Sequence, residues 1–389
     1  MPQAVIVDAI RTPVGRAFKG SLATLRPDET LAFVIDQLLE RNPGVDPAAV
    51  EEVVAGCGLP QGLQANNVAR IAVLLSSKLG QETNGITVSR YCASGLDAIR
   101  AAANNVVAGQ GDVYIAGGVE FVSRYNAAQE AAHPEDQNER LQGHEPGQPD
   151  AYIAMGLTAE NVADKYGVTR EAQDQYAQRS QERAVAAQAD GFFAREIVPV
   201  TLPDGTVVEK DDGPRADSTL EKLASLKPAF REDGTVTAGN ACPLNDGAAA
   251  ALIMSDAKAE ELGLTPRARI ITAATWGNEP EYMGVAPIGA IRKALDRAGL
   301  TIDDIDVVEL NEAFAAQVLP IADECGIDME KLNPHGGAIA LGHPFGMTGV
   351  RMMTTLLNDL ETIGGRYGVE TMCVAQGQGE AMVIERIAA

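Results

Sequence analysis

The chain has 389 residues, of which 46% are hydrophobic and 4% aromatic, and it carries a formal net charge of -23. This length predicts two or three domains rather than one small core. The acidic average field argues against a nucleic-acid backbone or an anionic membrane surface as a partner, and no segment approaches the ~20 consecutive apolar residues of a membrane-spanning helix.

The first 118 residues alternate strand-like runs with helical patterns, a rhythm that predicts a parallel or mixed sheet. We expect this first α/β half to be completed by a later segment at about 248–265. The expected strands are 4–10, 50–55, 86–89 and 113–116, and the expected helices are 28–41, 66–75 and 96–108.

The pattern changes after two glycines at 117–118, and residues 119–247 are predicted to form an inserted loop domain. A second α/β half follows at 266–389. In both halves a strand is followed by chemistry-bearing residues and then by a helix, so we expect a duplicated unit. In the second half we expect strands at 268–272, 307–310, 371–374 and 381–386, and helices at 288–298, from 313 onward and at 349–360.

A cysteine stands where the third expected strand gives way to a helix. Cys92 follows this strand and precedes a run of small residues, so its thiol should lie at a helix start. Free N–H groups and the helix macrodipole favour thiolate there and can lower the pKa of a cysteine from ~8.5 towards neutrality. The pattern fits a nucleophile, and it also fits an ordinary buried cysteine.

Three further segments contain candidate catalytic residues. Asn311 lies at a strand-to-helix junction, where it could equally cap the helix. His343 follows a glycine-rich run and could act as a general base or be a hydrogen-bonded structural histidine. Cys373 ends a strand beside a glycine-rich turn, a position that also suits tight hairpin packing.

The five cysteines are widely spaced and contain no C-x-x-C pair, which argues against a disulfide framework and against structural zinc. The chain enters a strand-like run at once, without the regions of a secretory signal. We therefore expect a cytoplasmic protein that binds no metal. The cysteines are Cys57, Cys92, Cys242, Cys325 and Cys373.

Ordered motifs along the whole chain resemble those of the thiolase family, whose members make or break the carbon–carbon bond of 3-ketoacyl-CoA thioesters. The resemblance implies duplicated α/β halves in a layered αβαβα core with an inserted loop domain. The matching segments are 9–15, 92–96, 117–120, 155–161, 237–241, 245–249, 311–315, 336–344 and 373–379.

The resemblance also implies an acetyl-CoA acyltransferase that works through a covalent acyl-cysteine. By similarity, His343 helps to deprotonate Cys92, which attacks the 3-keto carbon. Cys373 protonates the departing acetyl-CoA enolate and then activates incoming CoA. One oxyanion site is implied at His343 and a water held by Asn311, and the other at the N–H groups of Cys92 and Ala375.

CoA is implied as a co-substrate, with no further cofactor, and the family forms homodimers or homotetramers. The anionic CoA requires a local basic patch, for which Arg215, Lys222, Lys227 and Arg231 are candidates. The contacts with CoA and with the acyl group that the resemblance implies are Arg215, Ala238, Cys242, Leu244, Met155, Met283 and Phe314.

Several positions depart from the family pattern. Ala375 and Gln376 replace glycines, and an alanine can still offer its N–H if its backbone needs no glycine-only conformation. His335 replaces an asparagine and is expected to pack. Cys242 replaces a serine near the pantetheine, where a thiol is the weaker hydrogen-bond donor.

Ala154 stands where acetoacetyl-CoA-type thiolases have a histidine. This difference favours longer or different 3-ketoacyl chains and the degradative direction, as in the β-oxidation of fatty acids or a related acyl-CoA degradation. The alternatives are an acetoacetyl-CoA-type biosynthetic thiolase, a condensing enzyme of the ketoacyl-synthase type, and a catalytically silent homologue that binds acyl-CoA or lipid.

Overall fold

The computed structural model describes residues 2–125 and 134–387. Parts of the expected loop domain and of the second half, namely residues 126–133 and 388–389, lie outside the described residues. The main sheet has the strand order β10-β11-β12-β9-β1-β8-β5-β3-β4, and a short strand β2 (Gly15–Arg16) pairs with β8. Its two ends come from the two halves of the chain.

The first half contributes a five-stranded unit. β4, β3 and β5 run parallel, whereas β8 lies antiparallel between β5 and β1. The strands are β1 (Ala4–Arg11), β3 (Glu52–Gly56), β4 (Asn84–Val88), β5 (Val113–Phe121) and β8 (Asn245–Ser255), and the helices are α1 (Pro27–Arg41), α2 (Val68–Leu75) and α3 (Ser94–Val107).

The second half repeats this topology. β10 is parallel to β11, and β12 lies antiparallel between β11 and β9. A single parallel bridge from Val308 to Leu332 takes the place that β4 has in the first half. The elements are β9 (Ala268–Gly277), α9 (Ala286–Ala298), β10 (Val307–Leu310), α10 (Ala315–Cys325), α12 (Phe345–Ile363), β11 (Tyr367–Val374) and β12 (Gln378–Arg386). The expected duplication is confirmed.

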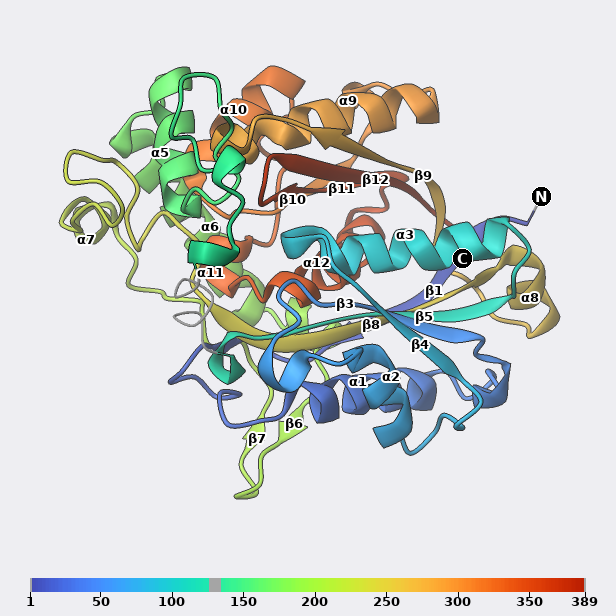
Figure 1. Cartoon of the computed structure of the whole chain (residues 1–389). Coiled ribbons are helices and arrows are strands. Elements are labelled where there is room, and N and C mark those ends of the chain that lie inside the picture. The colour runs from blue at the N-terminus through green and yellow to red at the C-terminus, as the bar shows by residue number, and fades with distance from the viewer. Residues whose placement is uncertain (1, 126–133, 388–389) are drawn as a thin grey trace.

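The helices form layers around the two parts of the sheet (Figure 1). α3 and α12 lie between the halves, where Leu96 and Met353 share one apolar core with Ile253 and Met382 from the two sides of the sheet. α1 and α2 cover the outer face of the first half, and α9 and α10 cover that of the second. The chain therefore has the expected αβαβα order.

The segment between β5 and β8 carries most of the remaining elements. β5 runs to Phe121 and β8 starts at Asn245, so the strands extend a few residues past the expected boundaries at 118 and 248. This segment contains α5 (Met155–Tyr166), α6 (Arg170–Ala189), β6 (Val200–Thr201), β7 (Val207–Val208) and α7 (Leu220–Ala224), while α8 (Asp256–Glu261) and α11 (Ala338–Leu341) lie in the two halves.

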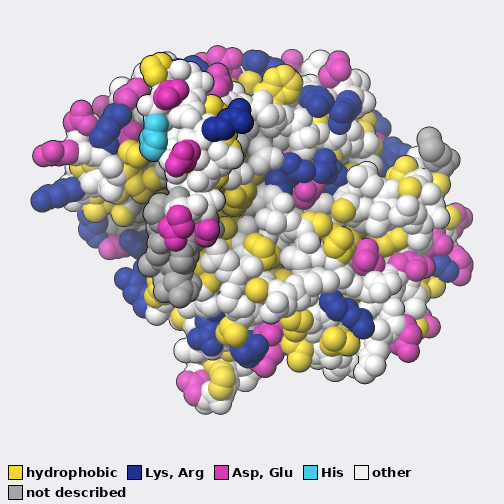
Figure 2. Space-filling model, in the orientation of Figure 1, with side chains coloured by type: hydrophobic (Ala, Val, Ile, Leu, Met, Phe, Trp, Pro, Cys, Tyr) yellow, Lys and Arg dark blue, Asp and Glu magenta, His cyan; other side chains and the backbone are white. Residues whose placement is uncertain are grey.

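The surface shown in Figure 2 intersperses acidic and basic side chains, so on this face the negative charge is spread rather than gathered in one patch. Among the described residues, no helix is both long enough and apolar enough to cross a membrane.

Candidate active site

Cys92 lies in a tight turn, Tyr91–Ala93, that joins β4 to α3. Tyr91 has a positive φ of 42°, a backbone conformation that costs energy for a residue with a side chain and often marks a functional site. Ser94 holds the turn, because its Oγ accepts from the N–H of Arg90 at 2.8 Å and donates to the carbonyl of Tyr91 at 2.7 Å. The thiol is thus fixed at the start of α3, as expected.

The contact between α3 and α12 brings the Cys92 turn close to the loop that carries His343. The two helices approach so closely that a Cβ on Gly349 would lie 2.1 Å from the backbone nitrogen of Leu96. Only glycine allows this approach.

The electrostatics of Cys92 differ from the expectation of a lowered pKa. Burial raises the pKa of this thiol well above its ordinary value, the neighbouring Cys373, Cys242 and Glu120 raise it further, and a hydrogen bond from the N–H of Ala375 lowers it. The expectation was wrong because desolvation of the thiolate outweighs the helix-start N–H groups. Cys92 is therefore a thiol in the free protein and needs a base.

His343 supplies a neutral imidazole. Its ring is buried, and burial together with the charge of Arg351 lowers its pKa to about 3. Nδ1 lies 2.7 Å from Thr348 Oγ1, whose proton goes to the carbonyl of Pro344. Thr348 must then accept from Nδ1–H, so Nε2 is the unprotonated nitrogen and the one that can take a proton.

Asn311 contacts this second ring nitrogen. Its Nδ2 lies 3.2 Å from His343 Nε2, and its buried Oδ1 has no hydrogen-bond partner among the described residues. The alternative that Asn311 caps a helix is wrong, since α10 starts at Ala315 with Phe314 at its cap position. The free Oδ1 suits the predicted role of holding a water.

Cys373 is the second-last residue of β11 and is fully buried. Gln317 Nε2 donates a hydrogen bond of 2.8 Å to its sulfur. Burial raises the pKa of Cys373 to about 11, against the lowering effect of Gln317. Our sequence reasoning missed Gln317, for which the only signal was a polar residue within the apolar pattern of α10.

Ala375 begins a three-residue loop between β11 and β12. The backbone φ of Ala375 is not positive, whereas Gln376 has a φ of 64° and Gly377 a φ of 75°. The alanine therefore needs no glycine-only conformation, and its N–H is directed to Cys92.

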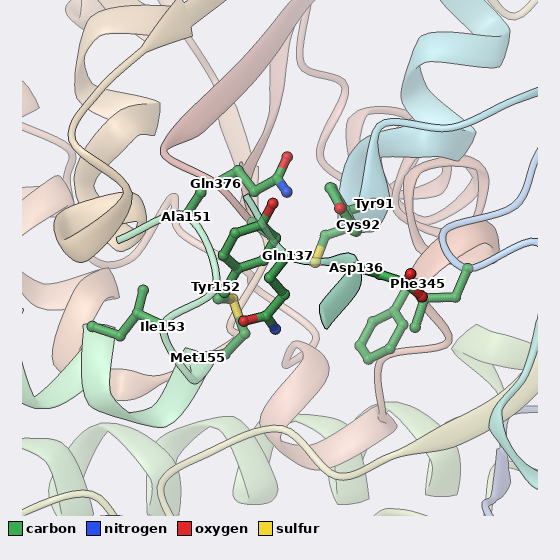
Figure 3. A pocket seen from close by; sticks show the side chains of 12 residues that line it. Tyr91, Cys92, Asp136, Gln137, Ala151, Tyr152, Ile153, Met155, Phe345 and Gln376 are labelled. Atoms are coloured by element: carbon green, nitrogen blue, oxygen red, sulfur yellow. The ribbon is translucent and has the colours of Figure 1, made fainter. Parts of the chain in front are cut away.

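A cavity of about 520 Å³ opens in front of Cys92 (Figure 3). Leu59, Met155 and Phe345 give it apolar walls, and Gln376 lies at its edge. Met283 and Phe314, the other residues expected at the acyl group, do not line this cavity but are buried in the apolar cluster of Cys373, against which Met155 packs.

A second cavity, of about 310 Å³, has three cations in its lining and one carboxylate, Asp217, which pairs with Lys222 at 2.7 Å. Arg16, Arg215 and Lys222 line it together with Ala238. Arg16 Nε is buried with no hydrogen-bond partner in the part of the chain that the structure describes, and burial and the charge of Arg16 lower the pKa of Arg215. Two guanidinium groups that repel each other favour an anion between them.

The other residues predicted to contact CoA are spread around this second cavity. Cys242 is adjacent to Pro243, which lines the cavity, and it lies near enough to Cys92 to contribute to the raised pKa of that thiol. Leu244 is 48% exposed and lines neither of these two cavities. Lys227 is also absent from the lining, and Arg231 instead pairs with Asp164 at 2.8 Å. Only two of the four expected basic residues therefore belong to it, and Arg16 was missed.

Two buried carboxylates support the site and were not predicted. Glu120 accepts from the N–H groups of Gly58 at 2.7 Å and Gly346 at 2.8 Å, which ties the loop after β3 to the start of α12. Glu312 accepts from the hydroxyls of Tyr176 and Ser180 at 2.7 and 2.6 Å.

His335 packs against Phe192 as expected, with ring centroids 3.6 Å apart. Its Nδ1 also lies 2.5 Å from Asp359 Oδ1.

The chain matches the thiolase N-terminal domain over residues 4–257 and the thiolase C-terminal domain over residues 264–386. It is 48% identical to the β-ketoadipyl-CoA thiolase of Pseudomonas aeruginosa, over 99% of each chain. It is 45% identical to the 3-oxoadipyl-CoA/3-oxo-5,6-dehydrosuberyl-CoA thiolase of Escherichia coli, over 100% of each.

Two solved structures are also similar. One is the acetyl-CoA acetyltransferase of Bacillus anthracis, with a TM-score of 0.91, 40% identity, and coverage of 100% of this chain and 99% of that one. The other is the dimeric peroxisomal thiolase of Saccharomyces cerevisiae, with a TM-score of 0.92, 38% identity, and coverage of 99% and 98%.

Proposed function

This chain belongs to the thiolase family, and we propose that it is a degradative thiolase that cleaves a 3-ketoacyl-CoA with CoA into acetyl-CoA and a shortened acyl-CoA. The observation that carries this proposal is that the reactive residues lie in two close pairs. Cys373 is near enough to Cys92 to raise its pKa, and Asn311 Nδ2 lies 3.2 Å from His343 Nε2, two residues before Phe345 in the lining of the Cys92 cavity. The pairing of a nucleophile with a separate proton donor is what carbon–carbon cleavage requires.

In the first half-reaction, the neutral Nε2 of His343 takes the proton of Cys92, and the thiolate attacks the 3-keto carbon. The carbon–carbon bond then breaks, leaving the acyl group on Cys92 and an acetyl-CoA enolate. The thiol of Cys373 gives its proton to the enolate carbon, and acetyl-CoA departs. Because burial disfavours both the Cys92 thiolate and the imidazolium, we expect proton transfer to occur together with attack.

In the second half-reaction, the Cys373 thiolate takes the proton of incoming CoA. The CoA sulfur attacks the acyl thioester, and the bond from the acyl carbon to Cys92 breaks. Cys92 then recovers its proton from the His343 imidazolium. Both thiols end protonated, as they began.

Negative charge develops on an oxygen in each half-reaction. The N–H groups of Cys92 and Ala375 are proposed to bind one oxyanion, and His343 with a water on Asn311 the other. Loss of one such donor commonly costs about 3 kcal/mol of barrier. The ordinary backbone of Ala375 supports its share of this role.

For the acyl group, the relatives named as β-ketoadipyl-CoA thiolases favour a 3-oxoadipyl-type substrate over a simple fatty acyl chain. A relative in Saccharophagus degradans with 45% identity is named 3-ketoacyl-CoA thiolase, which keeps fatty-acid β-oxidation as the alternative. CoA is proposed to lie with its phosphates at Arg16 and Arg215, as a co-substrate and without a further cofactor.

The assembly proposed is a homodimer in the cytoplasm. β4 is the outermost strand of its side of the sheet, and it has exposed apolar residues on it and beside it: Ile86 within β4 is 44% exposed, and Leu74 and Leu75 at the end of α2 are 53% and 48% exposed. Open strand edges with apolar neighbours pair readily. The yeast structural relative is described as dimeric.

The proposal is tested by mixing the protein with CoA and either 3-oxoadipyl-CoA or acetoacetyl-CoA and following loss of the enolate absorbance. The wild-type protein should cleave 3-oxoadipyl-CoA. Cys92→Ala should form no acyl-enzyme that mass spectrometry detects, whereas Cys373→Ala should become acylated but turn over poorly. No thiolysis with 3-ketoacyl-CoA of any chain length would instead indicate a silent acyl-CoA-binding homologue.

A further inference from the structure

We infer that Gln376 is a specificity residue, which selects an acyl group bearing a hydrogen-bond-accepting oxygen beyond its reacting carbonyl. The inference rests on the proposed function and deepens it. The cavity in front of Cys92 would then select the acyl group by its oxygen, which the four reactive residues do not do.

The backbone of Gln376 is strained. Its φ of 64° lies in the left-handed region, which favours glycine over a residue with a side chain. The next residue, Gly377, must be glycine, since a Cβ there would lie 2.1 Å from the carbonyl oxygen of Asn278. The loop thus keeps a long polar side chain at a position where glycine would be easier, and such strain concentrates at functional sites.

The side chain of Gln376 is exposed and lies at the edge of the cavity that holds Cys92 (Figure 3). It has no hydrogen-bond partner among the described residues, in contrast to Gln378 two residues later, which binds Arg90 at 3.0 Å. The amide is therefore free to bind a substrate, whereas its neighbour holds the hairpin.

Two other lining residues leave donors free on the same cavity. Tyr152 accepts from the N–H of Asn138 at 3.1 Å, so its own hydroxyl proton remains. Gln137 Oε1 accepts from Gln142 Nε2 at 3.3 Å, so its own amide hydrogens remain. The hydroxyl proton of Tyr152 and the amide hydrogens of Gln137 have no acceptor among the described residues, and a ligand oxygen that accepts hydrogen bonds would complement them.

Charge separates this cavity from the CoA site. Among its described lining residues there is no Lys, Arg or His, and Asp136 is the one charged side chain. The phosphates of CoA are better placed in the cationic cavity around Arg16 and Arg215. The acyl group is left for the cavity of Gln376, where uncharged donors can bind a hydroxyl, a carbonyl or a carboxylate oxygen.

The test compares three 3-oxoacyl-CoA thioesters of equal acyl length that end in a methyl, a hydroxyl or a carboxylate group. Wild type should have a higher kcat/KM for the oxygen-bearing thioesters. Gln376→Leu removes the amide at similar size, and Gln376→Gly also relieves the strained φ. Both should reduce the ratio of kcat/KM for oxygen-ended over methyl-ended substrate by about fivefold or more, mainly through KM, as expected for one lost hydrogen bond.

Gln376→Asn keeps an amide and tolerates the left-handed backbone, so it should restore part of the ratio. A larger loss of kcat/KM with the carboxylate-ended thioester than with the hydroxyl-ended one would identify the carboxylate as the group that Gln376 binds. An unchanged ratio in both Leu and Gly variants, or a wild type without preference, would overturn the inference while leaving thiolase activity established. Failure of wild type with all three thioesters would overturn the proposed function itself.

Discussion

Replacing Gln317 by methionine tests how the buried Cys373 is kept able to transfer protons. The change removes the N–H donor 2.8 Å from the sulfur and preserves the side-chain length. A hydrogen bond to a charged group contributes about 1.5–3 kcal/mol, so its loss should reduce the thiolate population of Cys373 at a given pH roughly 10- to 100-fold. Since the pKa of this thiol is already about 11, the variant should need a still higher pH for the same rate of thiolysis.

The assay is the pH dependence of kcat for thiolysis, together with the amount of acyl-enzyme at steady state. The alkaline limb should move to higher pH, and acyl-enzyme should accumulate because CoA is activated more slowly. Gln173→Met is the matched control: Gln173 is also fully buried, its Nε2 also donates, to Thr235 Oγ1 at 2.9 Å, and its Oε1 also lacks a partner among the described residues. An unshifted pH profile in Gln317→Met, or an equal shift in Gln173→Met, would refute the role of Gln317.

Two further predictions concern the CoA cavity and the Glu120 carboxylate. Arg16→Ala should raise the KM for CoA roughly tenfold and weaken the salt dependence of KM, with little change in kcat. Lys227→Ala, which lies outside the cavity, should leave the KM for CoA unchanged. Equal effects of the two substitutions in steady-state kinetics would contradict the anion site. Glu120→Gln should lower the free energy of unfolding by about 2 kcal/mol, because an amide NH₂ would face the donors that now bind the carboxylate. Burial raises the pKa of Glu120 to about 7, above its unfolded value, so its contribution to wild-type stability should fall as pH rises from about 4.5 through 7. Urea unfolding of the two proteins at pH 5 and 8 should then give a larger difference at pH 5, and a difference independent of pH would contradict this assignment.

The strands were predictable where the sheet is covered on both faces. Every residue of β1 and β5 is buried, and each strand appears in the sequence as a mostly apolar run that is interrupted only by Asp8 and Arg11 in β1 and by Glu120 in β5. The return of a later segment to complete the first half was expected, but its place between β1 and β5 was not predictable, because β8 is far from β1 in sequence. Its alanines at 248–251 also favour helix locally, and burial within the sheet overrides that preference.

The reactive residues were predictable because chemistry restricts them to few types at the ends of strands and helices. Their environment was not: the helix-start argument for Cys92 left out desolvation, which the three-dimensional packing decides. Gln317 and Arg16 were missed for the same reason. An isolated glutamine or arginine gives no sign in the sequence of the sulfur or the second guanidinium beside it.

The long separation between β1 and β8 also has a consequence for synthesis of the chain. β1 ends at Arg11, and its partner strand β8 is complete only at Ser255. At ~5–20 residues per second, the ribosome needs on the order of 10–50 s to make the intervening segment. β1 lacks its partner throughout that time and β5 lacks it from its own synthesis onward, so the nascent chain exposes unpaired strand edges until β8 is made.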